Sequence, residues 1–320
     1  MSVIRKGLYK MAKNVFLFSG QGSQYVGMGK ELCDAYPEMK ELYDKASEIL
    51  GFDLYDTINS STEEELAQTV NSQPAIMLTS LVAFEIMKKN GIEFSAVAGH
   101  SLGEYAAMVA SGVLSFEDGV RVIKARAAAM QKAAENSDGA MYAVLGKTAE
   151  EIEEVCASID GYVVPVNYNS AAQTVIAGET SAAEAAAAKF AEMGAKAVKL
   201  GVSSAFHSKL MQPAADEFEA ELKEMDIIFN KPSVQFFSNL YGAEMPDFEN
   251  MPEKLAKHIV SPVKFTSELA LLAEQGYENF IELGPNKVLT GLVKKTLKGV
   301  NAMNVENAKT LEKALDALKA

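Results

Sequence analysis

One short stretch has the residue types and spacing of a catalytic serine: GHSLG at 99–103, with Ser101 between two glycines. An apolar run, residues 94–98, precedes it, and a helical pattern begins at Leu102. The motif G-x-S-x-G between a strand and a helix is typical of a nucleophile elbow, a tight turn that presents the serine hydroxyl. The pattern therefore favours Ser101 as a nucleophile over a structural turn.

A serine hydroxyl needs a base to be nucleophilic near neutral pH, and histidine is the usual one. The chain has three histidines. His100 adjoins Ser101, and adjacent side chains of a strand point to opposite faces, which makes His100 a poor base. His207 and His258 remain, and the residues alone leave the choice between them open.

The turn SGQGSQ at 19–24 follows an apolar run, residues 15–18, and invites a nucleotide-binding interpretation. The spacing contradicts it, because Tyr25 stands at the third glycine of G-x-G-x-x-G and Gln24 replaces the first glycine of a Walker motif. In a parallel sheet such a turn would instead bring Gln21 and backbone N–H groups beside the elbow. We expect an oxyanion donor here rather than a phosphate site.

Arginine is the third candidate, in the helical pattern that resumes after residue 115. At about 100° per residue one face is apolar, and Arg126 flanks it while Arg121 points away; the apolar residues are Phe116, Val120, Ile123, Ala127 and Met130. An arginine at the edge of a buried face needs an anionic partner. The residues alone leave open whether this partner is a carboxylate of the chain itself or a carboxylate of a substrate.

The composition argues against several other classes of function. A formal net charge of −13 is unfavourable for nucleic-acid binding, which requires a basic surface. Cys33 and Cys156 lie in separate helical patterns and are expected to be reduced, buried thiols. No zinc motif is present, and none of the apolar runs reaches the ~18 residues that cross a bilayer or forms a signal-peptide core. We expect a cytoplasmic protein with a leader at residues 1–11.

The elements that must position these residues alternate strands with helices, which predicts an α/β fold with a mainly parallel sheet. Ser115, with Asp118 three residues on, is expected to cap the helix that carries Arg126. Residues 137–204 differ: their order of strand, helix, strand, strand, helix, strand is that of a ferredoxin-like unit. We therefore expect this small domain to be inserted into a large catalytic domain formed by residues 1–136 and 205–320.

Seven motifs resemble one family across nearly the whole chain: the malonyl-CoA:acyl-carrier-protein transacylases and, more broadly, the acyltransferase domains of fatty-acid and polyketide synthases. The motifs are FSGQGSQ (18–24), GHSLGEY (99–105), KARAAAMQ (124–131), NYNSAAQTVIAG (167–178), SAFHSKLM (204–211), SPVKF (261–265) and ELGPNKVLTGL (282–292). The resemblance implies an α/β-hydrolase-like large domain with a ferredoxin-like (βαββαβ) insert. It also implies transfer of malonyl groups from malonyl-CoA to a carrier protein.

The resemblance gives each motif residue a role. It implies Ser101 as the acylated nucleophile and His207 as its base. It implies an oxyanion hole made by Gln21 and the N–H of Leu102. For the substrate, it implies Arg126 as the partner of the malonyl carboxylate, and it places Met130, Asn169 and Phe206 in the pocket.

Two positions depart from the family pattern. Ser19 stands where members often have proline, a change expected to matter little. His258 stands where many members have a glutamine whose backbone carbonyl orients the catalytic histidine. If the backbone carbonyl orients the catalytic histidine, the change from glutamine to His258 is tolerable. If the side chain at this position helps, the role of the His258 side chain is open.

The resemblance implies an acidic carrier protein as partner and no permanently bound cofactor, and we expect a monomer. Docking on so acidic a chain would need a local basic area, and there are two candidates: Lys294, Lys295 and Lys298, or Lys196, Lys199 and Lys209. Two rival functions remain. One is a serine esterase in which His258 is the base and Asp247 the acid; the other is a non-catalytic carrier-binding protein.

Overall fold

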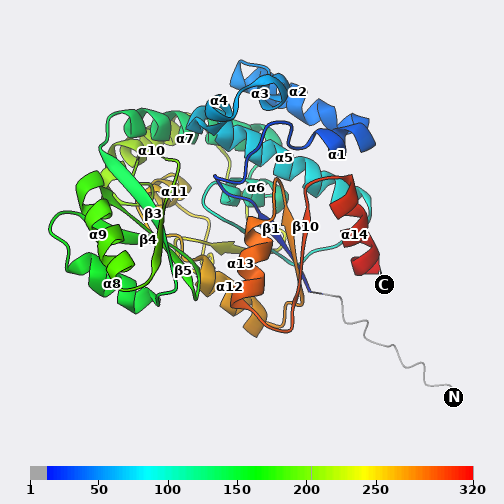
Figure 1. Ribbon diagram of the computed structural model, residues 1–320. Coiled ribbons are helices and arrows are strands. Elements are labelled where there is room, and N and C mark those ends of the chain that lie inside the picture. The colour runs from blue at the N-terminus through cyan, green and yellow to red at the C-terminus, as the bar shows by residue number, and fades with distance from the viewer. Residues whose placement is uncertain (1–12, 203, 320) are drawn as a thin grey trace.

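The computed structural model describes residues 13–202 and 204–319, and two sheets lie side by side in it with helices packed around them (Figure 1). The expected leader, residues 1–11, falls outside this range. The larger sheet has the order β10-β9-β1-β2-β7-β8. Its strands are β1 (Asn14–Phe18), β2 (Ala96–Gly99), β7 (Gln235–Ser238), β8 (Ala243–Glu244), β9 (Asn279–Leu283) and β10 (Asn301–Val305).

The larger sheet is parallel except at one edge, where β8 pairs antiparallel with β7. β1 lies inside the sheet and is buried along its whole length. Phe16 and Phe18 enter the core on one face, and Val15 and Leu17 enter the core on the other. A strand covered on both faces needs such a continuous apolar run. The predicted α/β fold with a mainly parallel sheet is confirmed.

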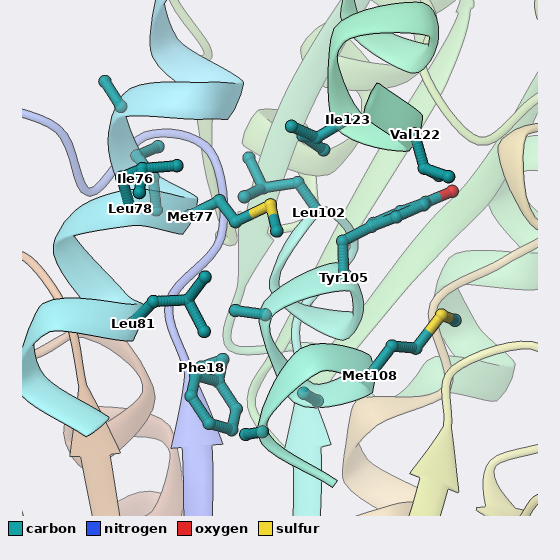
Figure 2. Close-up of a cluster of buried hydrophobic side chains, with 14 of the residues drawn as sticks. Phe18, Ile76, Met77, Leu78, Leu81, Leu102, Tyr105, Met108, Val122 and Ile123 are labelled. Carbon is teal, nitrogen blue, oxygen red and sulfur yellow. The ribbon is translucent and has the colours of Figure 1, made fainter. Parts of the chain in front are cut away.

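Helices cover both faces of this sheet. α5, α6 and α7 pack on the face of Phe18, where Met77 and Leu81 of α5 meet Leu102 and Tyr105 (Figure 2). α12 and α13 cover the opposite face. The helices that surround the sheet are α1 (Lys30–Ala35), η1 (Pro37–Met39), α2 (Lys40–Leu50), α3 (Leu54–Ser60), α4 (Glu63–Ala67), α5 (Thr69–Lys89), α6 (Gly103–Ala110), α7 (Phe116–Glu135), η2 (Lys209–Met211), α10 (Gln212–Glu224), α11 (Met251–Ile259), α12 (Phe265–Glu274), α13 (Val288–Thr296) and α14 (Ala308–Lys319).

Two helix starts show how local chemistry sets the boundaries. Ser115 caps α7 as predicted, because its hydroxyl accepts from the N–H of Asp118 at 3.0 Å. The Asp118 carboxylate pairs with Arg121 at 3.0 Å. α5 begins at Thr69 and contains Pro74, and its Thr69 N–H donates to the side chain of Gln131 at 2.9 Å. That contact from α7 allows the helix to begin before the proline.

The smaller sheet is antiparallel, in the order β4-β5-β3-β6. Its elements follow the predicted order: β3 (Gly139–Leu145), α8 (Ala149–Ala157), β4 (Val163–Ser170), β5 (Gln173–Glu179), α9 (Thr180–Glu192) and β6 (Lys196–Lys199). α8 and α9 pack on one face, over Tyr142 and Val144. Met141 and Ala143, which alternate with them, point to the other face, toward the main core.

β4 also pairs with the segment that leads into α12. Val263 donates its N–H to the carbonyl of Val166 at 2.8 Å, and its own carbonyl accepts from Tyr168 at 2.9 Å. Cys33 and Cys156 are buried free thiols, as predicted. Within residues 13–202 and 204–319, none of the helices has the length and apolarity needed to cross a membrane.

Candidate active site

Ser101 lies in a sharp turn between β2 and α6. Its φ of 54° places it in the left-handed region, which non-glycine residues rarely adopt. The glycines on either side are needed for close approach. A Cβ on Gly99 would lie 2.1 Å from the carbonyl carbon of Gly103, and one on Gly103 would lie 2.1 Å from the carbonyl oxygen of Phe18. The local geometry is that of a nucleophile elbow.

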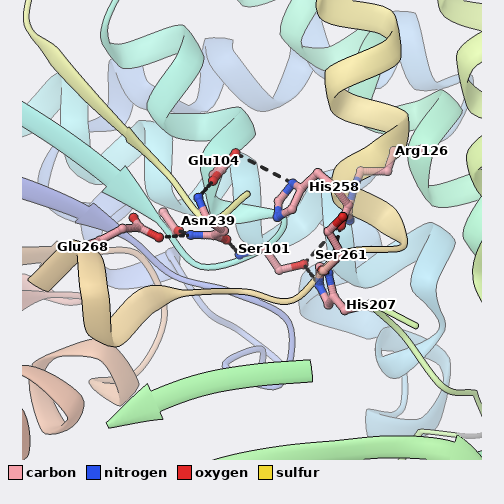
Figure 3. Close-up of polar contacts among 9 residues, drawn as sticks. Ser101, Glu104, Arg126, His207, Asn239, His258, Ser261 and Glu268 are labelled. Carbon is pink, nitrogen blue, oxygen red and sulfur yellow. Dashed lines mark hydrogen bonds and ion pairs between the residues drawn. The ribbon is translucent and has the colours of Figure 1, made fainter. Parts of the chain in front are cut away.

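His207 is the histidine that contacts the serine. Its Nε2 lies 2.7 Å from Ser101 Oγ, across 106 residues of sequence (Figure 3). Its Nδ1 lies 3.1 Å from the carbonyl oxygens of both His258 and Ser261. Carbonyl oxygens only accept, so Nδ1 carries the proton and donates. In the neutral ring, Nε2 is then free to accept the Ser101 proton.

The surroundings of His207 keep it neutral. Burial, then the positive charge of Arg126, then His100 lower the pKa of His207 to about 3. The two carbonyl acceptors of Nδ1 oppose this change but do not outweigh it. His207 is therefore unprotonated at neutral pH, which is the state that a general base requires.

Arg126 lies beneath the serine. It is fully buried, and its Nη2 donates to Ser101 Oγ at 3.1 Å. The guanidinium lies 5.1 Å from the ring centroid of Tyr105, and its Nε has no hydrogen-bond partner within the described part of the chain. Arg121 instead pairs with Asp118 near the surface. A buried guanidinium with a free donor beside the nucleophile is available to an anion that enters the site.

The turn after β1 faces the same space. Gln21 is half-buried and lines a cavity together with Ser101 and His207. The turn is anchored by Ser19, whose hydroxyl is within reach of Glu282 Oε1 at 3.2 Å and the carbonyl of Pro285 at 3.3 Å. The serine at this departure from the family pattern thus makes contacts that a proline could not make.

Leu102 lies at the N-terminal end of α6, with its side chain in the core. The first N–H groups of a helix have no intrahelical acceptor. The Leu102 N–H therefore suits an oxyanion donor next to Ser101.

The cavity has a volume of about 450 Å³ and lies between the two sheets. Among the predicted pocket residues Met130, Asn169 and Phe206 line it, whereas Arg126 is not part of the lining and reaches the site through its contact with Ser101 Oγ. Asn169 Oδ1 is 2.8 Å from His100 Nε2, an arrangement that occupies His100 away from Ser101. Met130 receives a hydrogen bond on sulfur from Gln73 at 3.4 Å.

His258 contacts the site through its backbone. Its carbonyl accepts from His207, whereas its own ring is buried, with Nδ1 3.7 Å from Glu104 Oε2. Burial lowers the pKa of His258 well below the ordinary value, so the ring is neutral. Asp247 pairs with Lys254. The structure does not bring His258 and Asp247 together at Ser101, because the ring of His207 lies beside the Ser101 hydroxyl.

Sequence reasoning missed the polar residues beneath Ser101. The Ser101 N–H donates to Asn239 Oδ1 at 2.7 Å, and Asn239 Nδ2 donates to Glu268 Oε1 at 2.7 Å. Asn239 follows β7, which pairs parallel with β2, so both strands end at the same edge; the sequence alone does not record that pairing. Among the described residues, no group of three or more His, Cys, Asp or Glu side chains is placed to hold a metal ion.

The sequence and the fold are similar to those of known proteins. Residues 15–316 match the family model described as acyl transferase domain. The malonyl CoA-acyl carrier protein transacylase of Bacillus subtilis is 41% identical over 97% of this chain and 98% of its own length. The crystal structure of the enzyme of that name from Clostridium perfringens has a TM-score of 0.91 and 41% identity, covering 96% of this chain and 98% of its own. A malonyl-transacylase solved in complex with its type II PKS acyl-carrier protein has a TM-score of 0.91 and 35% identity, covering 96% of this chain and all (100%) of its own.

Proposed function

The chain belongs to the acyl transferase domain family and is an acyltransferase, and from that premise we propose that it moves a malonyl group from malonyl-CoA to the phosphopantetheine thiol of an acyl carrier protein. One observation carries the proposal. Ser101 Oγ lies 2.7 Å from the base His207 and 3.1 Å from the guanidinium of Arg126. A cation at the nucleophile favours an acyl group that has a carboxylate of its own.

The first half of the reaction forms an ester. Ser101 Oγ bonds to the thioester carbonyl carbon while its proton passes to His207 Nε2. The carbon–sulfur bond then breaks, the proton passes from His207 to the CoA sulfur, and free CoA leaves. The malonyl group remains on Ser101, with its carboxylate held by Arg126.

The second half reverses these steps with a different thiol. The phosphopantetheine thiol gives its proton to His207, and its sulfur attacks the ester carbonyl. Ser101 Oγ leaves and takes the proton back from His207. In both halves Gln21 and the Leu102 N–H would stabilise the oxyanion, each by about 3 kcal/mol.

Transfer competes with hydrolysis, so the ester must be protected from water. The cavity between the sheets supports this requirement, because the small sheet covers one side of it with side chains; these are Met141, Ala143 and Val175 and the amides Asn167, Asn169 and Gln173. We propose that the two walls belong to separate domains, residues 1–136 with 205–320 and residues 137–204.

For the docking of the carrier protein, we favour the lysines at the end of α13 and shortly after it: Lys294, Lys295 and Lys298. They are exposed, and α13 also lines the cavity with Val288 and Leu292. In the other candidate cluster, Lys199 pairs with Glu184 and Lys209 lies over the ring of Tyr162. Those two lysines already have partners within the chain.

Mass spectrometry of the intact protein tests the proposal. The protein is mixed with equal amounts of malonyl-CoA and acetyl-CoA, and the adduct is then chased with a phosphopantetheine-bearing carrier protein. We expect a malonyl adduct on Ser101 that disappears on the chase and reappears on the carrier. Ser101→Ala should form none. Loss of the adduct to water without appearance on the carrier would show an esterase, and no adduct on the intact protein would show a non-catalytic one.

A further inference from the structure

A buried polar cluster lies beneath Ser101, inside the protein. It consists of Asn239, Glu104 and Glu268, whose exposed fractions are 0%, 2% and 0%. Asn239 follows β7, Glu104 lies in α6 and Glu268 in α12, and none of these three residues lines the cavity. Buried polar groups are costly unless they are hydrogen-bonded. The hydrogen-bond partners of these three residues therefore indicate the role of the cluster.

Asn239 stands at the centre of these contacts (Figure 3). Its Oδ1 accepts from the Ser101 N–H at 2.7 Å. Its Nδ2 donates to the carbonyl of Gly99 and to Glu268 Oε1, both at 2.7 Å. Its backbone N–H donates to the Glu104 carboxyl group. One amide side chain thus bridges the Gly99 carbonyl and the Ser101 N–H, the two backbone groups that flank His100.

The contacts also fix which way the amide faces. The Gly99 carbonyl can only accept, so the nitrogen of Asn239 must face it, and the oxygen must then face the Ser101 N–H. Aspartate would keep an acceptor for Ser101 but lose both amide donors. Leucine has a similar volume and can make none of the three side-chain bonds. Asparagine therefore suits this position in a way that neither replacement does.

The elbow needs such a restraint. The left-handed conformation of Ser101 is disfavoured for a residue with a Cβ, and it persists only when surrounding contacts hold it. That conformation sets two directions at once: that of Oγ toward His207 and that of the following peptide, whose N–H belongs to Leu102. The hydrogen bond from the Ser101 N–H to Asn239 holds the peptide bond between His100 and Ser101, which directly precedes the Ser101 side chain and the Leu102 N–H.

The two acids add no net charge beneath the serine. Burial is the main cause that raises the pKa of Glu104, to about 8, and it raises the pKa of Glu268 well above the ordinary value. Burial therefore favours the neutral, protonated form of both acids beneath Asn239, and the positive charge beside the nucleophile is that of Arg126.

We propose that Asn239 is a positioning residue, whose side-chain amide holds Ser101 in the left-handed conformation that aims Oγ at His207 and the Leu102 N–H at the acyl oxygen. This inference rests on the proposed function, malonyl transfer, for the identity of the natural substrate. The orientation of the Ser101 hydroxyl, however, can be measured without that substrate.

The experiment compares Asn239→Leu, Asn239→Ser and Asn239→Asp in two reactions. The first is the single-turnover release of CoA at saturating malonyl-CoA. The second is the modification of Ser101 by phenylmethanesulfonyl fluoride, a reagent with no carboxylate. We expect the leucine and serine variants to lose roughly 10- to 100-fold in both rates, while the KM for malonyl-CoA changes less than threefold. Asn239→Asp retains the acceptor and should fall between these variants and the unchanged protein.

Asn14 supplies the matched control. It is also a buried asparagine, and its amide donates to the Glu93 carbonyl at 2.7 Å and accepts from Asn279 at 2.9 Å. Asn14 lies at the start of β1, at the end of that strand away from Gln21 and the active site. Asn14→Leu should lower Tm without changing either rate more than twofold. If Asn239→Leu fails to fold, the smaller Asn239→Ser decides the question.

Folded Asn239 variants with rates within twofold of the unchanged protein would overturn the inference. An equal loss of rate in Asn14→Leu would also overturn it, since the effect would then be one of general stability. The two reactions separate this inference from the proposed function. If malonyl-CoA forms no adduct but the sulfonyl fluoride still discriminates among the Asn239 variants, the positioning role stands and the malonyl-transfer proposal fails.

Discussion

The two walls of the cavity are built in different ways. The larger sheet supplies polar groups from the ends of adjacent parallel strands: Gln21 after β1 and Ser101 after β2 line the cavity, and Asn239 after β7 lies behind Ser101, outside the lining. The smaller sheet supplies one of its faces, with apolar side chains and a few amides along it; those that line the cavity are Met141, Ala143, Asn167, Asn169, Gln173 and Val175. Strand ends gather polar groups at one edge, whereas a sheet face offers a broad surface.

This difference separates two kinds of effect. At the end of β2, the hydrogen bonds of Ser101 are 2.7 to 3.1 Å long and join it to two groups that would take part in the chemistry, His207 and Arg126, and to the positioning residue Asn239. On the smaller sheet, most contacts would be with the substrate and would be made equally before and during reaction. Changes of the first kind should lower kcat, and changes of the second kind should raise KM.

The largest effect is expected at His207. His207→Ala removes the base at 2.7 Å from Ser101 Oγ and should lower the rate of malonyl-Ser101 formation roughly 10³-fold, within the range for general-base catalysis. Rapid-quench measurement of the adduct gives this rate. His258→Gln is the matched control, because the hydrogen bond that His258 makes to His207 comes from its backbone carbonyl, which glutamine keeps; it should stay within threefold. A loss of more than tenfold in His258→Gln would give the His258 ring a role.

The sequence predicted the elements that carry this chemistry because each left a local pattern. The buried run at β1, the glycine spacing around Ser101 and the apolar face of α7 are all short-range signals. The order of strands and helices around the smaller sheet was also predicted from such local patterns. β10 and α14 were missed, since the strand NAMNV has no continuous apolar run and its side chains are mostly only partly buried.

The pairing of residues distant in sequence could not be derived from the same patterns. Ser101 and His207 are 106 positions apart, and the residues alone left His258 open as the base. For the same reason the sequence did not predict that Asn239, which is 138 positions from Ser101, contacts it. Such contacts depend on which strands are neighbours in the sheet, and no local period records that. The family motifs supplied the choice of His207.

Arg126 should give the next largest effect. Arg126→Leu keeps an apolar volume in the buried face of α7 but removes the guanidinium. Malonyl transfer should fall about 100-fold relative to acetyl transfer, as expected for the loss of a charge-assisted hydrogen bond to a carboxylate. The measurement is kcat/KM for both CoA esters. Arg121→Leu, on the same helix but paired with Asp118 near the surface, should leave the ratio unchanged. Equal losses for both esters would remove Arg126 from its proposed role.

The pH profile tests the surroundings of His207. A folded-state pKa of about 3 means that the ring stays neutral as the pH falls from 7 to 5, and protonation stops the base only below that range. Acylation should therefore change less than twofold between pH 7 and 5. An ordinary histidine with a pKa of ~6.5 would lose about 30-fold at pH 5. Stopped-flow release of CoA measures the profile, with circular dichroism at each pH to exclude unfolding.

On the smaller sheet the expected effect is weaker and of the other kind. Asn169→Ala removes contacts with His100 at 2.8 Å and Gln173 at 3.4 Å. We expect KM for malonyl-CoA to rise about fivefold, with kcat changed less than twofold, which corresponds to roughly 1 kcal/mol of uniform binding. Tyr168→Phe, which alters a hydroxyl paired with Glu153 near the surface, is the control on the same strand. A fall in kcat alone would place Asn169 with the catalytic groups.

The smallest effect is expected outside both walls, where docking would begin. Lys294→Glu with Lys295→Glu reverses charge at the exposed end of α13, which lines the cavity, and should raise KM for an acidic carrier protein about threefold at low salt. The effect should shrink at high ionic strength, because exposed charges are screened. Lys196→Glu with Lys199→Glu makes the same charge change on β6, where Lys199 already pairs with Glu184, and should have less effect. KM for malonyl-CoA, measured in parallel, separates carrier docking from binding of the CoA phosphates. If the β6 variant alone weakens the carrier, docking belongs to the edge of the smaller sheet, and that sheet then does more than form a wall.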